Sequence, residues 1–455
     1  MENPHSAKGS VGADELRATF ALAVPVVLVQ LGFMMMGVVD TLMVGRVSAR
    51  VLAAVALGNL YYFNVTILAT GSLMALDPIV AQAVGAGETE SVARAMQRGL
   101  IIAAGFCVFC ALCIAPAPTV LTTLRQPGEI VGDASTYLRI SLAGVAPYLV
   151  FVVLRQSLQA MHRVAPIVWT VIVANLTNAV FNWIFVFGHL GSPAMGAAGS
   201  AIATAISRWL MLLLLLAWAW RDLRPLMLPV RDGIGSWPAL SQMLRIGLPI
   251  GAQQGLEAAA FGAIGLLMGV LGTVEMAAHQ VAITLAAFTF MVPLGVGSAT
   301  AVRVGRAIGA SDMPRARAAI RAAYLCGVGF MALTAIAFIW VPHVLAAAFT
   351  PDARVIALAS TLIPIAGVFQ MFDGAQAVGA GVLRGAGDTK APLVTMLASY
   401  WLVGVPVSAY LGFRTSLGAA GLWWGFVVSL AGVAIFLFLR IRVVFAQSVG
   451  RVREH

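Results

Sequence analysis

Charged residues are scarce in this sequence. Only 10% of its 455 residues are Asp, Glu, Lys or Arg, whereas 60% are hydrophobic, and the mean hydropathy is +0.94. So little charge cannot cover the surface of a water-soluble protein of this length. The apolar runs are long and continuous rather than alternating, which excludes the strands of a membrane barrel. The sequence therefore predicts an all-α polytopic membrane protein.

Cysteines and the motifs of soluble enzymes are also few or missing. The four cysteines lie inside apolar runs with no metal-ligating partner spaced beside them: Cys107, Cys110, Cys113 and Cys326. They predict packing rather than a disulfide framework or a metal centre. The sequence has no P-loop and no Ser/His/Asp pattern on a recognisable elbow. We therefore expect no ATP hydrolysis by this chain, no catalytic residues and no cofactor.

A formal charge of +10 could suggest a nucleic-acid partner. The basic residues, however, lie mainly in short loops between apolar runs, where positive charge fixes membrane topology. The segments after even-numbered runs are rich in Arg, as in Arg221, Arg224 and Arg231, whereas those after odd-numbered runs are sparse. Because cytoplasmic loops carry the excess of positive charge, both termini are predicted to be cytoplasmic. No nucleic-acid partner is expected.

Apolar runs bounded by charge or by Gly and Pro clusters predict twelve membrane spans. They lie near 18–44, 53–76, 95–117, 134–158, 166–188, 197–219, 245–271, 277–300, 319–343, 355–383, 392–412 and 418–440. The longest connection is polar, basic and contains proline. The predicted domains are a cytoplasmic lead-in over 1–17, a six-helix bundle over 18–219, a cytoplasmic linker over 220–244, a second six-helix bundle over 245–440 and a basic cytoplasmic tail over 441–455.

The second half of the sequence repeats the first with a shift of 224 positions. Pro249 then falls on Pro25 and Gly295 on Gly71, in a register held for about sixty residues. Each half has six predicted spans, an even number, so both halves enter the membrane in the same direction. This predicts a parallel internal repeat, related by a pseudo-two-fold axis along the membrane normal.

Three acids fall inside predicted spans: Asp40 in span one, Glu257 in span seven and Asp373 in span ten. An acid at such depth costs at least a few kcal/mol, so it indicates either a functional site or a buried hydrogen-bonded residue. Asp40 lies near the outer end of its span. Glu257, with Gln253 and Gln254 about one helical turn before it, and Asp373 fall near mid-depth. These last two acids could share a cation or a proton.

Polar residues also form two stripes in the first half. One follows helical spacing on span five and the other on span six: Asn175, Asn178 and Asn182, and Ser200, Thr204 and Ser207. Such groups often only link packed helices. Beside an intramembrane Asp, two stripes favour a hydrated pocket in the first half.

Four segments carry a likeness to a known family: PVVLVQLGFMMMGVVDTLMVG, ALDPIVAQAVGAGE, PIGAQQGLEAAAF and FDGAQAVGAGVLRGAGDTKAP. They resemble the multidrug and toxic compound extrusion (MATE) family, nearest its bacterial NorM-type branch, and the likeness covers the chain from about residue 16 to 440. The resemblance implies two six-helix bundles that open alternately to either side of the membrane. It also implies export of organic cations in exchange for sodium ions or protons.

The resemblance also implies roles for individual residues. The family's acidic positions fall on Asp40, Glu257 and Asp373, and its first-half polar network falls on Asn178, Asn182 and Thr204. Some relatives place an acid where this chain has Asn182, so Asp40 is the only carboxylate of that network here. The Glu257 and Asp373 pair is then the better candidate for ion coupling, including a possible sodium site.

Three functional hypotheses remain. The main one is an ion-coupled multidrug exporter of cationic amphipathic compounds in a bacterial cytoplasmic membrane, with membrane lipids around it and, by family analogy, a monomer. The second is a flippase for a lipid-linked cell-envelope precursor. That function would need Arg or Lys inside spans, whereas the bases lie mainly in loops. The third, a membrane enzyme or receptor, fits a whole-chain duplication less well.

Overall fold

The computed structural model describes residues 4–446 and 449–452, except for the side chains of residues 4–13. These ranges are helical, with short connections. Twelve segments are long and apolar enough to cross a membrane: Asp14–Gly45, Ala49–Gly85, Thr89–Ile114, Gly128–Ala160, Ala165–Phe187, Gly196–Met227, Trp237–Leu271, Thr273–Gly309, Met313–Trp340, Ala353–Gly385, Lys390–Arg414 and Gly418–Val444. The predicted all-helical membrane fold with twelve spans is confirmed.

The ends of the predicted lead-in and tail, residues 1–3 and 453–455, lie outside the described residues, as do 447 and 448. The rest of the lead-in is already helical, because the first helix begins at Pro4. The helices are α1 Pro4–Gly45, α2 Ala49–Leu73, α3 Leu76–Gly85, α4 Thr89–Ile114, α5 Ala117–Thr123, α6 Gly128–Ser141, the 3₁₀ helix η1 Leu142–Gly144, α7 Val145–Ala160, α8 Ala165–Phe187, α9 Gly196–Met227, α10 Trp237–Leu271, α11 Thr273–Gly309, α12 Met313–Trp340, α13 Pro342–Ala347, α14 Ala353–Gly385, α15 Lys390–Met396, the π-helix η2 Leu397–Gly404, α16 Val405–Arg414 and α17 Gly418–Val444.

Three spans are built from more than one helix. The second span joins α2 to α3, the fourth joins α6, η1 and α7, and the eleventh joins α15, η2 and α16. In each case the last helix has a proline in its first turn: Pro78 in α3, Pro147 in α7 and Pro406 in α16. Proline lacks a backbone N–H and is tolerated where a helix begins. The sequence therefore starts a new helix inside these spans.

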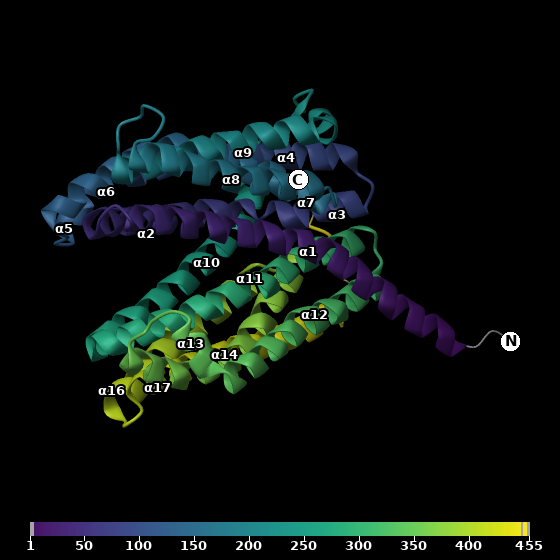
Figure 1. Ribbon diagram of the computed structural model, residues 1–455. Helices are drawn as coiled ribbons and strands as arrows, with labels where there is room; N and C mark the ends of the chain where they lie inside the picture. The colour runs from purple at the N-terminus through teal and green to yellow at the C-terminus, as the bar shows by residue number, and fades with distance from the viewer. Residues whose placement is uncertain (1–3, 447–448, 453–455) are drawn as a thin grey trace. The chain divides into compact units, whose positions relative to one another are not determined.

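The chain forms two compact units. The N unit contains Leu28–Val84 and Glu88–Gly251, and the C unit contains the described residues up to Val27, Gly85–Gly87 and the described residues from Ala252 onward. The lead helices of the two halves, α1 and α10, therefore each contribute to both units, and α1 does so as one continuous helix (Figure 1). The predicted domain boundaries near 219 and 245 stay a prediction.

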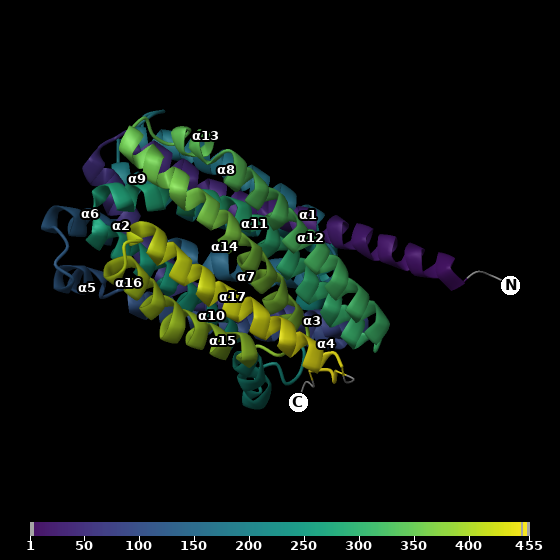
Figure 2. The same cartoon turned by 90° about the horizontal axis from the view of Figure 1, so that it is seen from below.

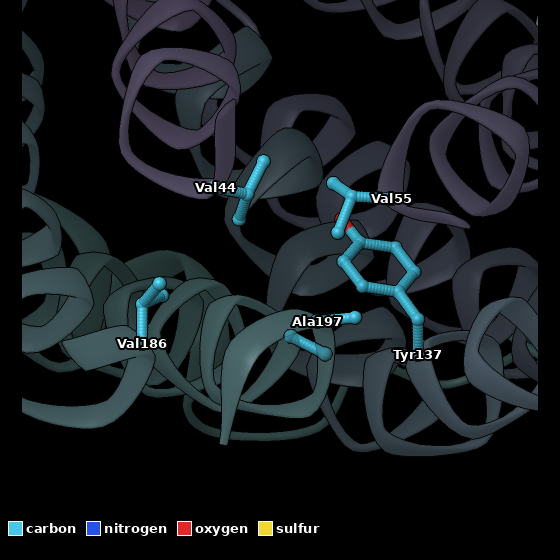
Figure 3. Close-up of a cluster of buried hydrophobic side chains, with 6 residues drawn as sticks. Val44, Val55, Tyr137, Val186 and Ala197 are labelled. Atoms are coloured by element: carbon cyan, nitrogen blue, oxygen red, sulfur yellow. The ribbon is translucent and has the colours of Figure 1, made fainter. Parts of the chain in front are cut away.

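A buried apolar cluster lies in the N unit, made by side chains of α1, α2, α6, α8 and α9: Val44, Val55, Tyr137, Val186, Ala197 and Ala201 (Figure 3). The hydroxyl of Tyr137 donates to Asn59 Oδ1 at 3.1 Å. Val44 and Val186 each lie one helical turn after a polar residue, Asp40 and Asn182. The cluster therefore closes one end of the polar group that those two residues belong to.

In the C unit, α11 and α14 pack through small residues. A Cβ on Gly381 would overlap the carbonyl of Gly297, and a Cβ on Gly385 would lie 2.6 Å from Ala301 O. Small residues allow membrane helices to approach this closely. The helix α14 also runs beside α17 (Figures 1 and 2). Close packing on these sides fixes the position of α14, the helix that carries Asp373.

Candidate ion and substrate sites

In the N unit, Asp40 is a buried acid that accepts two hydrogen bonds. Its side chain is only 3% exposed near the end of α1. Thr204 Oγ1, from α9, donates to Asp40 Oδ2 at 2.9 Å. Asn182 Nδ2, from α8, donates to Oδ1 at 2.7 Å. The structure thus brings together the acid and two of the polar residues that the sequence predicted beside it.

Several polar atoms around Asp40 have no partner. Asn178 is fully buried, yet within the described residues neither its Nδ2 nor its Oδ1 has a hydrogen-bond partner, and the same holds for Asn182 Oδ1. Buried polar atoms are nearly always satisfied, so these need an explanation. Asn178 Oδ1, Asn182 Oδ1 and the Asp40 carboxylate together offer hard oxygen ligands that suit a proton, a water molecule or a small hard cation. Asn175 stands apart, since its Nδ2 donates to Val171 O.

In the C unit, Glu257 on α10 belongs to a chain of hydrogen bonds. Gln376 Nε2, from α14, donates to Glu257 Oε1 at 3.0 Å. The hydroxyl of Tyr400, from η2, donates to Gln376 Oε1 at 3.2 Å. Trp401, the next residue of η2, donates its indole N–H to Leu256 O at 3.2 Å. The π-helical segment is therefore anchored to α10 directly beside Glu257, and π-helical turns are frequent at functional sites.

Asp373 lies on α14 one turn before Gln376 and is only 4% exposed. Within the described part of the chain it makes no hydrogen bond, and its Oδ1 is buried without a partner. It interacts electrostatically with Glu257. A buried, ionised and unpaired carboxylate is very unfavourable. A proton or a cation would stabilise such a pair, and the sharing of one by Glu257 and Asp373 stays a prediction.

No group of three or more His, Cys, Asp or Glu that could hold a metal ion is found among the described residues. A small cation at the C-unit acids would therefore need further oxygen ligands, and the side-chain oxygen of Gln376 and the Tyr400 hydroxyl are the polar groups joined to Glu257. The two glutamines predicted beside Glu257, Gln253 and Gln254, are half-buried on α10. Their part in the site stays a prediction.

Sequence reasoning missed the polar neighbours of Asp373. Gln370 and Gln376 lie three residues to either side of it, so all three share one face of α14. Gln370 Nε2 donates to Thr289 Oγ1 at 2.7 Å, and its Oε1 accepts from Thr334 at 2.9 Å. This spacing is visible in the segment FQMFDGAQ. Tyr400 had no such signal, because only the packing of η2 brings it to Gln376.

Two arginines inside spans, Arg155 and Arg208, are exceptions to the expectation that the bases lie mainly in loops. Arg208, in α9, donates from Nη1 to the hydroxyl of Tyr62 at 2.6 Å. Arg155, in α7, lies over the ring of Phe33 at 5.5 Å from Cζ to the ring centroid. The sequence places Arg155 close to a span end, and Arg208 is a single charge in a long apolar run. The argument against an anionic ligand from missing interior bases therefore does not hold.

Twelve spans in two repeated halves, with acids buried inside each unit, define a membrane transporter. The family model named MatE matches residues 25–184 and 249–410. The chain is 38% identical over 435 residues to a protein named "Probable multidrug resistance protein NorM" from Mesorhizobium japonicum, covering 94% of this chain and 93% of the relative. It is 33% identical over 435 residues to "Multidrug resistance protein MdtK" from Edwardsiella ictaluri, covering 94% and 95%. The chain belongs to the MatE family, a family of transporters and not of enzymes.

Solved structures share the fold of this chain. A eukaryotic MATE transporter, AtDTX14, superposes with a TM-score of 0.87 at 21% identity, covering 97% of this chain and all (100%) of that one. A multidrug resistance MATE family transporter in an outward-facing conformation gives a TM-score of 0.87 at 20% identity, covering 95% and 96%. At such identities the likeness concerns the fold alone.

Proposed function

We propose that this protein exports organic, mostly cationic amphipathic compounds by alternating access, in exchange for sodium ions or protons. The observation that carries the proposal is the acid pair of the C unit. Asp373 is buried without a hydrogen bond in the described chain, and Glu257 accepts one from Gln376. Such a pair can be neutralised by a proton, by a sodium ion or by a cationic substrate. The printed names of its relatives, multidrug resistance proteins NorM and MdtK, agree with this function.

Coupling would follow from competition at these acids. A carboxylate that has taken up a proton or a sodium ion no longer attracts an organic cation. Ion binding shifts the transporter between its conformations only if the affinity differs between them, since equal affinity shifts nothing. We place Asp40, with Asn178, Asn182 and Thr204, as a second ion-responsive site. In this proposal the protein is a monomer of the bacterial cytoplasmic membrane with both termini in the cytoplasm.

The test is transport of a fluorescent organic cation into or out of proteoliposomes, with a sodium gradient and a pH gradient imposed separately. We expect one gradient to drive transport in the wild type, and Glu257→Gln and Asp373→Asn to abolish it. Asp133→Asn is the matched control, because Asp133 forms an exposed ion pair with Arg50. Full transport by the Glu257→Gln and Asp373→Asn variants would overturn the assignment of the coupling site.

The interior arginines favour one second candidate, a flippase for an anionic lipid-linked precursor. Arg155 and Arg208 would then contact its phosphate groups. The flippase function requires binding of a polyprenyl phosphate to the protein. It also requires that the wild type does not transport the fluorescent cation under either gradient. The acid pair of the C unit has no role in that function, so we rank it second.

A further inference from the structure

The two halves carry opposite chemistry at matching positions of their lead helices. With the shift of 224 positions, Glu257 in α10 corresponds to Phe33 in α1. Glu257 contacts a polar partner on α14, Gln376. Phe33 instead contacts Phe151 of α7 edge to face, with ring centroids 6.2 Å apart, and lies beneath the guanidinium of Arg155. The place that holds an acid in the C unit therefore holds an aromatic ring and a cation in the N unit.

Arg155 is a cation inside the fourth membrane span, Gly128–Ala160. Its guanidinium lies over the ring of Phe33, a residue near the middle of the span Asp14–Gly45. Within the described residues Arg155 makes no hydrogen bond or ion pair, and its Nε is buried without a partner. Its side chain is nevertheless partly exposed. A lipid-facing arginine inside a membrane span is costly, so we infer that the exposed part faces a space inside the protein.

The surroundings of Arg155 suit a flat aromatic molecule. Tyr148 meets Phe33 edge to face, with ring centroids 6.4 Å apart, and both rings are partly exposed. The guanidinium of Arg208 lies on the other side of Tyr148, with its Cζ 5.2 Å from that ring and 4.4 Å from the ring of Tyr62. Two guanidinium groups and two accessible rings therefore lie together in one unit. Rings of this kind bind aromatic groups, and a guanidinium fork matches a carboxylate in a bidentate manner.

A structural role for Arg155 is the main alternative. The fully buried Asp77 acts on it electrostatically, so Arg155 could serve only to balance that acid. An arginine kept for this purpose would be needed equally for every substrate. An arginine that binds a substrate would matter only for substrates that carry an anionic group. The two roles therefore predict different specificity.

We propose that Arg155, with Phe33 and Tyr148 and with Arg208 nearby, is a subsite for the carboxylate of aromatic amphiphilic substrates. The inference deepens the proposed export function and rests on it. Substrates with both a cationic and an anionic group would place the carboxylate against Arg155 in the N unit. Compounds with only a positive charge would not use this subsite.

Two dyes that differ at one group test this subsite. The first is a cationic xanthene dye with a free benzoate, and the second is its methyl ester, in which the carboxylate is masked. Binding of each to detergent-purified protein is measured by fluorescence anisotropy, and the readout is the ratio of the two dissociation constants. We expect Arg155→Gln to raise the dissociation constant of the benzoate dye, relative to that of its methyl ester, roughly tenfold or more. Arg155→Lys should change this ratio less, because lysine keeps the positive charge but lacks the bidentate guanidinium group.

Arg50→Gln is the control, because Arg50 is an exposed arginine paired with Asp133. A ratio that stays unchanged in Arg155→Gln, or equal weakening of both dyes together with a lower thermal midpoint, would overturn the subsite. A polyprenyl phosphate that displaces the bound benzoate dye at a lower concentration than added benzoate dye does would assign Arg155 to a lipid phosphate. That result would also overturn the proposed subsite. Binding needs no gradient, so failure of the subsite is distinguishable from failure of ion-coupled export in proteoliposomes.

Discussion

The three acids inside the spans differ in how many hydrogen bonds reach them. Asp40 accepts from two side chains, Thr204 and Asn182. Glu257 accepts from Gln376 and also interacts with the Tyr400 hydroxyl. Asp373 accepts from no described residue. Each donor that reaches a carboxylate stabilises its ionised form and reduces its need for an ion. Ion exchange should therefore depend most on Asp373 and on how firmly Gln376 holds Glu257.

Removing the donor to Glu257 should change ion affinity rather than abolish transport. In Gln376→Ala the ionised carboxylate loses its amide partner, so it should bind a proton more tightly and release it more slowly, whereas a sodium ion would also lose an oxygen ligand. A hydrogen bond to a charged group contributes about 1.5–3 kcal/mol, which corresponds to roughly tenfold or more in half-maximal ion concentration. Tyr400→Phe should have a smaller effect of the same sign, because the Tyr400 hydroxyl donates to Gln376 Oε1 and interacts less closely with Glu257 itself. Ion titrations of transport in proteoliposomes measure both variants. A larger effect of Tyr400→Phe than of Gln376→Ala would contradict this order of hydrogen bonds.

A second residue-scale prediction concerns stability. Arg303 of α11 pairs with Glu15 of α1 and donates to Thr19, and the side chains of Arg303 and Glu15 are only 6% and 12% exposed. In Glu15→Gln the buried guanidinium loses its counter-charge, which should cost about 3 kcal/mol. Asp133→Asn breaks an exposed pair with Arg50 and should cost less than about 1 kcal/mol. Thermal unfolding in detergent compares the two, and equal midpoint shifts would refute the prediction.

At the scale of elements, the contact between α11 and α14 positions the acid pair. Gly381 lies against the backbone of Gly297, where no side chain fits. Gly381→Ala should push the helices apart and destabilise the protein by about 1–3 kcal/mol, and should also weaken ion-driven transport because α14 carries Asp373 and Gln376. Gly262 of α10 is the control, since a Cβ there meets nothing within 4 Å. Because helix propensity alone favours Ala over Gly, an equal loss of stability in Gly262→Ala would show that the contact between Gly381 and Gly297 does not decide the effect.

The elements also show what the sequence could and could not predict. Hydropathy locates all twelve spans, because a continuous apolar run has few alternatives in a membrane. It does not reveal that spans two, four and eleven are broken, since a new helix begins beside Pro147 whereas Pro249 lies inside an unbroken helix. Asp40, Glu257 and Asp373 are visible because charges are rare in such runs. Gln376 and Tyr400 become functional only through contacts between helices, which no local pattern encodes.

At the scale of the molecule, the lead helices α1 and α10 each belong partly to both units. The boundary between the two units falls between Val27 and Leu28 in α1, and between Gly251 and Ala252 in α10. Pro25 and Pro249 lie inside these helices two residues before the changeover. Proline removes a backbone hydrogen bond and permits a helix to bend. The repeat therefore places a proline, at which a helix can bend, at the same position in both lead helices.

The proposed orientation predicts which loops face the outside of the cell. Ser416 lies between α16 and α17, after the eleventh span, and Ser311 lies between α11 and α12, after the eighth. Both are exposed. With the four native cysteines replaced, Ser416→Cys should react with a membrane-impermeant thiol reagent in intact cells, whereas Ser311→Cys should react only after lysis. The reverse pattern would place both termini outside.

Competition between ion and substrate is the central claim, and equilibrium binding tests it most directly. The binding of a fluorescent organic cation to purified protein is measured at increasing sodium concentration at fixed pH, and at decreasing pH without sodium. The account predicts that one of the two ions weakens dye binding progressively in the wild type, and that this dependence disappears in Glu257→Gln and Asp373→Asn. If neither ion changes dye affinity in the wild type, or if the variants keep the full dependence, the acid pair of the C unit does not couple ion to substrate.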